Sequence, residues 1–225
     1  MGRVISRTAA ADDIYADVET THENARARGG KWQELEEQRL GNTIELIGVV
    51  RSRTKAAAEE LTPLLADLDA QDQQADRFIG RTSDEIWNDI GRPAFDPAYD
   101  VVFPGGIAYY TTGPDDEQPD RMDLLAELIE MNILPKLDKA KAAAAAKKVR
   151  EEAKAYREVL DRIALPRQRL RQLERVRTAL ARVAQIQLAN LKRVYKAEGF
   201  SEADIHAVIP DHPRSRKEPG TEAPA

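Results

Sequence analysis

Between Leu40 and Ile79, positions spaced alternately four and three apart are mostly apolar, with Arg51, Thr54 and Asp72 as the polar members. This spacing is typical of a helix that packs along one seam, as in a coiled coil. Forty residues of helix span roughly 60 Å. Pro63 lies inside the stretch, where its ring and missing N–H predict a kink that does not end so regular a pattern. We expect this heptad seam to join copies of the chain, and its apolar members are Leu40, Ile44, Ile47, Leu61, Leu65, Leu68 and Ile79.

Two further stretches show helical periodicity. The first spans about residues 10–28 and stops at Gly29, because glycine commonly follows the last turn of a helix. The second runs over residues 120–198, with Asp120 as its predicted N-cap. Pro135 and Pro166 interrupt this second stretch, and we expect kinks there rather than reversals.

The breaks in the two long stretches align when the chain between them is treated as a turn. Counted from the apical ends of the two arms, Pro63 and Pro135 lie 16 and 15 residues away, and Gly30 and Pro166 lie 49 and 46 away. We therefore predict two antiparallel arms with Pro63 opposite Pro135 and Gly30 opposite Pro166. Kinks paired in this way would let both helices bend together and stay packed.

Residues 80–119, between the arms, hold an unusual share of aromatic residues. Six of the chain's twelve aromatics lie within 24 positions there. Thr82 or Ser83 is expected to cap a short helix that ends at Gly91. The sequence FPGG at positions 103–106 fits a type II turn, with proline second and a glycine of positive φ third.

The segments on either side of this turn, 99–103 and 107–111, are predicted to be the strands of a short β-hairpin. An isolated hairpin is marginal in water and must pack on something. The hairpin could pack on the aromatic residues that precede it in the chain, or on a partner protein, and the sequence does not choose between the two. We expect a partner protein to bind the exposed part of this patch, through Tyr99, Val102, Phe103, Ile107, Tyr109 and Tyr110.

Together these elements predict an all-α protein. It is a long kinked antiparallel helical hairpin, a coiled-coil-like bundle with a small apical subdomain that contains the short β-hairpin. Ser201 is expected to cap a short helix after the second arm. The predicted segments are an N-terminal segment (1–9), the first helical arm (10–79), the apical subdomain (80–119), the second helical arm (120–198), a short C-terminal helix (199–209) and a tail expected to be disordered (210–225).

The composition agrees with helices that pack through narrow contacts. Hydrophobic residues make up 42% of the 225 positions, but much of that share is alanine and only 5% of residues are aromatic. The chain has no cysteine, which excludes disulfides, thiolate catalysis and cysteine-based zinc sites. No long apolar stretch opens the sequence, so we expect neither a signal peptide nor a transmembrane helix and predict a cytoplasmic protein.

Candidate catalytic residues are few. Glu19 and His22 form a Glu-x-x-His, the helical ligand pair of carboxylate-bridged di-iron bundles, but no second copy accompanies it. The chain has three histidines, no Gly-x-Ser-x-Gly motif and no phosphate-binding loop. We therefore predict a non-enzymatic protein and expect no metal and no cofactor.

Charge is distributed unevenly along the chain. Residues 1–135 hold 13 Lys and Arg against 27 Asp and Glu, whereas residues 136–198 hold 18 against 7. The arginines between Arg162 and Arg182 have few nearby acids in sequence. These arginines either pair with acids of the facing arm or of another subunit, or they follow the phosphates of a nucleic acid. The members of the possible nucleic-acid face are Arg167, Arg171, Arg175 and Arg182.

Three functions remain in the order that these patterns favour. The first is a structural or scaffolding protein, a homo-oligomer held by its heptad seams that presents the aromatic apex to another protein. The second is a nucleic-acid-binding helical protein. The third is a membrane-active protein, since long helices with an apolar hairpin at one end resemble the layout of helical pore-forming toxins. The patch is short and has acidic neighbours, so a membrane is the least expected partner.

Overall fold

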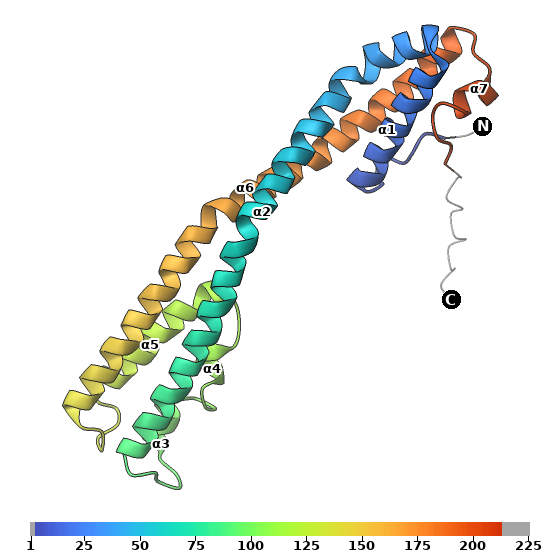
Figure 1. Cartoon of the computed structure of the whole chain (residues 1–225). Coiled ribbons are helices and arrows are strands. Elements are labelled where there is room, and N and C mark those ends of the chain that lie inside the picture. The colour runs from blue at the N-terminus through green and yellow to red at the C-terminus, as the bar shows by residue number, and fades with distance from the viewer. Residues whose placement is uncertain (1–2, 213–225) are drawn as a thin grey trace, which may run out of the picture. The chain divides into compact units, whose positions relative to one another are not determined.

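A computed structural model describes residues 3–212 of the chain (Figure 1). The structure is 80% helical, and the described residues form no strand beyond one isolated bridge between Arg3 and His212. The all-α class is therefore confirmed. In this described part, no helix has both the length and the apolar character needed to cross a membrane.

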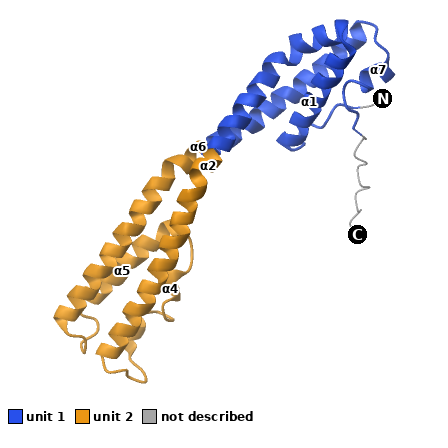
Figure 2. Cartoon of the chain, viewed as in Figure 1, with its two compact units in different colours: residues 1–56, 170–225 blue, residues 57–169 orange. Residues whose placement is uncertain are grey.

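Eight helical elements follow one another along the described chain. They are α1 (Ala11–Arg28), α2 (Gly30–Asp89), α3 (Pro97–Val102), α4 (Ala108–Thr111), the 3-10 turn η1 (Asp115–Glu117), α5 (Gln118–Glu130), α6 (Lys139–Ala197) and α7 (Glu202–His206). The chain divides into two compact units, shown in Figure 2. Unit 1 comprises residues 1–56 and 170–225, and unit 2 comprises residues 57–169, so that α2 and α6 contribute to both.

The two long helices α2 and α6 pack against each other antiparallel within each unit, but their register differs from the prediction. In unit 2 the side chains of Glu60 and Arg169 pair at 3.2 Å, and those of Asp67 and Arg162 pair at 3.6 Å. Pro63 and Pro166 lie between these two ion pairs, each three residues from one pair and four from the other. Pro63 is therefore level with Pro166, and its predicted pairing with Pro135 is wrong.

The ends of the two helices correct the second predicted pair. In unit 1 the ammonium group of Lys31 contacts the carboxylate of Glu198. Gly30 consequently lies beside the end of α6, next to Gly199 in level, and not opposite Pro166. The register differs because the arm that pairs with α2 begins at Lys139 and not at Asp120.

A reversal separates α5 from α6, where the sequence analysis expects only a kink. Asn132 adopts φ of 56°, a left-handed conformation that asparagine tolerates after a helix. Pro135 follows, and Asp138 then caps α6 by accepting hydrogen bonds from the backbone N–H groups of Ala140 and Lys141, at 2.9 and 3.1 Å. Asn132 and Asp138 are the local signals that distinguish this proline from Pro166.

The predicted β-hairpin is absent, and short helices take the place of its strands. Asp96 accepts hydrogen bonds from the N–H groups of Ala98 and Tyr99, and Pro97 stands at the first helical position, so the chain starts α3 here. The turn itself is present, since Gly105 has φ of 71° and the N–H of Gly106 donates to the carbonyl of Phe103. The aromatic positions follow helical rather than strand periodicity.

The end of the first arm also differs from the prediction. Thr82 and Ser83 are buried within α2, which continues to Asp89 and does not restart at either residue. Gly91, with φ of 89°, follows the end of this helix as expected. The Ser201 cap of α7 is confirmed, because its hydroxyl accepts the N–H of Asp204. The predicted tail falls largely on residues 213–225, outside the described residues.

Unit 1 packs α1 and the C-terminal segment against the α2/α6 pair. The hydroxyl of Tyr15 on α1 donates to the carbonyl of Arg177, and that of Tyr195 on α6 donates to the carbonyl of Trp32, at 2.7 and 2.8 Å. Trp32 also stacks on Phe200 at a centroid distance of 3.9 Å. The core of this unit contains, among others, Ile14, Tyr15, Val18, Leu40, Ile47, Ala184, Leu188, Leu191, Tyr195 and Ile205.

Unit 2 packs α5 and the apical segment against the same two helices. Arg150 and Arg157 of α6 form ion pairs with Glu130 and with Asp120 and Asp123 of α5. Small residues on α6 are buried at the helix contact, since Ala142, Ala146 and Ala153 are at most 5% exposed. Buried residues on the other elements include Leu61, Leu68, Ile79, Ile86, Val102, Phe103, Tyr110, Met122, Leu125 and Ile129.

Candidate interaction surfaces

The heptad seam lies inside the chain. Leu40 and Ile47 belong to the core of unit 1, and Leu61, Leu68 and Ile79 are buried in unit 2. Ile44 and Leu65, the other two members, are partly buried. The seam therefore packs α2 against neighbouring helices of the same chain. That the seam also joins copies of the chain stays a prediction.

The aromatic residues of the apex stack on one another. Ring contacts run from Trp87 to Tyr99, from Tyr99 to Phe103 and from Phe103 to Tyr110, with centroids 4.6, 4.9 and 6.0 Å apart. Burial raises the pKa of Tyr110 to about 12, and its hydroxyl donates to the carbonyl of Val102 at 2.6 Å. This cluster is a core of unit 2.

Few of the predicted partner-binding residues remain accessible. Val102, Phe103 and Tyr110 are at most 1% exposed, Tyr99 and Ile107 are partly buried, and Tyr109 is 46% exposed. That a partner binds the apex stays a prediction, and the surface available to it consists mainly of side chains outside the predicted set, Phe95 and Val101.

A different apolar surface lies on unit 1. Five large aliphatic side chains of α2 and α6 in unit 1 are between 41% and 52% exposed, although Ile47, Ala184 and Leu188 nearby belong to the core of this unit. Within each helix they are three or seven residues apart, so they project from one side. We call this set the apolar face, and its members are Leu46, Val49, Val176, Val183 and Ile186.

The two halves of the apolar face meet at the same level of the helix pair. The Lys31–Glu198 contact sets the antiparallel register in unit 1. Leu46 lies fifteen residues after Lys31, and Val183 lies fifteen residues before Glu198, which places Leu46 and Val183 at the same level of the helix pair. Exposed aliphatic residues therefore occur at matching levels on both helices.

The arginines of α6 fall into two groups. Arg162, Arg169 and Arg177 each pair with an acid, Arg177 with both Asp12 and Glu174. By contrast, no ion pair joins the residues predicted as a nucleic-acid face to any described acid, and these are Arg167, Arg171, Arg175 and Arg182. Pairing with the facing arm therefore accounts for the first group and leaves the second without partners among residues 3–212.

The unpaired arginines of unit 1 are aligned along α6. Arg171, Arg182 and Arg193 are eleven residues apart, which is close to three helical turns, so they project from one side over roughly 33 Å. Arg175 lies one turn after Arg171, and all four are exposed. We call these four residues the arginine row. Between Leu170 and the end of α6 at Ala197, the helix has one acidic residue, Glu174, which pairs with Arg177.

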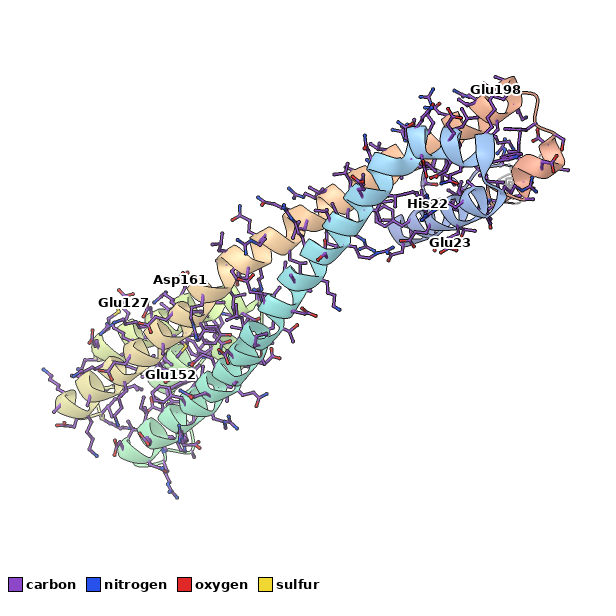
Figure 3. The ribbon with its side chains drawn as sticks, turned by 45° about the horizontal axis from the view of Figure 1, so that its top comes forward. His22, Glu23, Glu127, Glu152, Asp161 and Glu198 are labelled. Carbon is purple, nitrogen blue, oxygen red and sulfur yellow. The ribbon has the colours of Figure 1, made fainter. Side chains whose placement is uncertain are left out.

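All three histidines of the chain pair with carboxylates of unit 1. His22 on α1 lies 2.9 Å from Glu36 on α2, and His212 lies 2.7 Å from Asp17 (His22 is labelled in Figure 3). His206 approaches Glu202 at 3.1 Å. Burial raises the pKa of Glu36 and of Asp17, while the hydrogen bond from the histidine lowers it in each case.

The two residues of the Glu-x-x-His motif, Glu19 and His22, interact with side chains of α2. Glu19 accepts a hydrogen bond from Arg51 at 2.6 Å, and His22 pairs with Glu36. No group of three or more His, Cys, Asp or Glu side chains in residues 3–212 is arranged to hold a metal ion. These contacts hold α1 against α2.

The apolar face is the feature that the sequence analysis misses. A signal for it is present in the doublets Leu46-Ile47 and Val49-Val50, which make the apolar side of α2 wider than one seam. Comparison of the chain with protein-family models, with curated proteins and with solved structures finds no match.

Proposed function

We propose that the protein is a non-enzymatic interaction protein that self-associates through the apolar face of unit 1. The observation that carries the proposal is the position of Leu46 and Val183, which are half exposed and at the same level of two packed helices. Apolar side chains that gather in a continuous surface mark contact sites, whereas scattered ones do not.

A second copy fits this surface better than an unrelated chain. The face is built on two antiparallel helices, so the same face on another copy can pack against it around a two-fold axis. Such a contact would give the α2/α6 pair a second covered side, opposite the side that α1 covers, as in a four-helix bundle. Five half-exposed aliphatic residues supply the apolar centre of an interface of about 800 Å² per partner.

Replacing Leu46 and Val183 together by glutamate is expected to convert the oligomer to a monomer. Charges at the centre of an apolar interface would be desolvated without partners, which weakens association by at least about a hundredfold. Mass in solution, measured by sedimentation equilibrium over a range of concentrations, tests this. The matched control places glutamate at Gly48 and Thr178, which are exposed on other sides of the same helices.

Circular dichroism should show unchanged helicity in both double variants, because all four positions are exposed. A wild-type protein that is monomeric at the highest concentration, or a control that dissociates as readily as the variant, contradicts the proposal. Association through the apolar face should persist in high salt, since screening reduces the repulsion between the arginines of the two copies.

Nucleic-acid binding is a second candidate, and the arginine row supports it. Four exposed guanidinium groups that no ion pair joins to a described acid form a cationic row along one helix, and Arg167 in unit 2 is unpaired in the same way. Arginine binds phosphate groups through paired hydrogen bonds and releases condensed counterions when it does so.

Changing Arg171 and Arg175 to glutamate is expected to abolish duplex binding at low salt. In the wild type the logarithm of affinity should fall steeply with the logarithm of salt concentration, and loss of these two contacts should remove about two units of that slope. A control with Lys147→Glu and Lys154→Glu makes the same charge change on another part of α6. Absence of wild-type binding at low salt removes this candidate and leaves self-association untouched.

A further inference from the structure

A small cavity in unit 2 combines aromatic walls with carboxylates. Its volume is about 270 Å³, and it lies where the last turns of α2 meet α3 and the loop between them. Its lining is Ala94, three aromatic rings and three acids: Trp87, Phe95, Tyr99, Asp84, Asp96 and Asp100.

Two of the aromatic walls are held in place by the fold. The rings of Trp87 and Tyr99 meet edge to face at 4.6 Å and 60°. The Tyr99 hydroxyl lies 3.3 Å from the carbonyl of Ser83, to which it donates a hydrogen bond. Phe95 differs, because its side chain is 73% exposed and contributes little to the core. The exposed ring of Phe95 lies beside the two rings that the fold holds in place. A ligand that packs between all three rings would cover it.

One of the three carboxylates forms an ion pair, and the other two do not. Asp96 caps α3 and lies 3.2 Å from the ammonium of Lys136, whose hydrogen bond lowers the pKa of this carboxyl. Asp84 and Asp100 are exposed, and no ion pair joins either to a described residue. Both act on Tyr99, whose pKa is raised mainly by burial and further by these two charges. The rim thus holds two uncompensated negative charges close to the rings.

This combination selects one class of ligand. The faces of aromatic rings attract cations, and the attraction is strongest for cations that shed water readily, such as quaternary ammonium and guanidinium groups. We propose that this cavity binds an organic cation through Trp87, Phe95 and Tyr99, with Asp84 and Asp100 as its counter-charges. The cation is either a free alkylammonium compound or the guanidinium of an arginine on another protein.

Tryptophan fluorescence provides a direct test, because the chain has two tryptophans and Trp87 lines the cavity. In a Trp32→Phe background, Trp87 is the remaining reporter. Titration with choline and with N-acetyl-arginine amide should give a saturable change for at least one of the two. Choline alone identifies a small-molecule ligand, and arginine amide alone or more strongly identifies a protein side chain.

Neutral probes of the same shape separate charge from hydrophobic contact. The matched pairs are 3,3-dimethylbutanol for choline and N-acetyl-citrulline amide for the arginine probe. Neither neutral probe should bind. A neutral probe that binds as tightly as its cation overturns the proposal, and so does the lack of any saturable change with both cations.

Variants at exposed positions locate the binding. Phe95→Ala, and separately Asp84→Asn with Asp100→Asn, are expected to weaken binding about tenfold or more. The control, Asp115→Asn with Asp116→Asn, removes two charges from an exposed turn of the same unit. Binding that survives both cavity variants, or that falls equally in the control, places the cation elsewhere and overturns the inference. The outcome is independent of self-association through unit 1.

Discussion

Substituting Phe103 by alanine is expected to lower the free energy of unfolding of unit 2 by about 3–5 kcal/mol. Phe103 is 1% exposed and lies between the rings of Tyr99 and Tyr110. Removing its ring leaves a cavity that the short helices α3 and α4 cannot close without losing their own contacts. The aromatic cluster would therefore loosen as a whole.

The two tryptophans allow this loss to be assigned to one unit. Trp87 lies in unit 2 and contacts Tyr99, whereas Trp32 lies in unit 1. Denaturant unfolding followed by Trp87, in a Trp32→Phe background, reports the stability of unit 2. Tyr109→Ala is the matched control, because Tyr109 is 46% exposed and should cost only about 1 kcal/mol. Equal losses for the two substitutions would show that Phe103 is not part of a packed core.

Substituting His22 by alanine is expected to destabilise unit 1 at neutral pH. The Glu36 side chain is fully buried, and its Oε1 has no hydrogen-bond partner among the described residues. Without His22, Oε2 also loses its partner. Breaking a buried pair costs about 3–5 kcal/mol, and we expect the lower end here because His22 is 25% exposed and water can replace it in part.

The loss should shrink as the pH falls. Burial raises the pKa of Glu36 above its ordinary value of 4.5, and the hydrogen bond from His22 opposes this rise. In the variant the effect of burial is less opposed, so the folded state binds the proton more tightly than the unfolded state. The stability that the protonated Glu36 contributes to the variant is then fully present below pH 4.5 and is lost as the pH rises through the raised pKa of Glu36. The variant should regain stability between neutral pH and 4.5.

Other charges near Glu36 are Glu37 and Arg26, and both are present in wild type and variant alike. Asp17 also titrates with a raised pKa, but it lies in both proteins and cancels in the difference. Unfolding followed by Trp32 in a Trp87→Phe background measures that difference at each pH. His22→Ala combined with Glu36→Gln should recover most of the loss. A loss that is equal at every pH, and that Glu36→Gln leaves unchanged, would contradict the role of this carboxylate.

Several elements could be predicted because their signals are local. The helical repeat from Leu40 to Ile79 specifies α2, and glycines 29, 91 and 199 end helices at or near where they stand. Ser201 caps α7 for the same reason, since a cap depends on the residues within one turn.

The apical segment shows where local patterns mislead. The FPGG turn forms as expected, but the strands that the pattern predicts on both sides of it do not. Asp96 and Pro97 start a helix, and positions 99, 102 and 103 then face one core at helical spacing. A strand and a helix both fit so short an apolar segment, and here the Asp96 cap and the packing of Tyr99 against Trp87 accompany the helix.

The candidate surfaces depend on which residues other elements cover. The seam residues, the apical aromatics and the arginines of α6 could all be identified from the sequence, but their exposure could not. Leu46 and Ile47 are adjacent and equally apolar, and one is half exposed while the other is buried. Arg169 and Arg171 differ likewise, because only the first faces an acid of α2.

By itself the sequence determined the all-α class, the long helix around the heptad seam and several helix ends, because periodicity and capping act within a few residues. Only the tertiary structure decided the register of the two long helices. Whether Pro135 kinks a helix or reverses the chain changes which residues face α2, and that choice moves the partner of Pro63 from Pro135 to Pro166. It also decided that the seam lies inside the chain and that the apolar face lies outside. The physical reason is that a residue is buried by elements that are far apart from it in sequence, and a local pattern holds no information about those contacts.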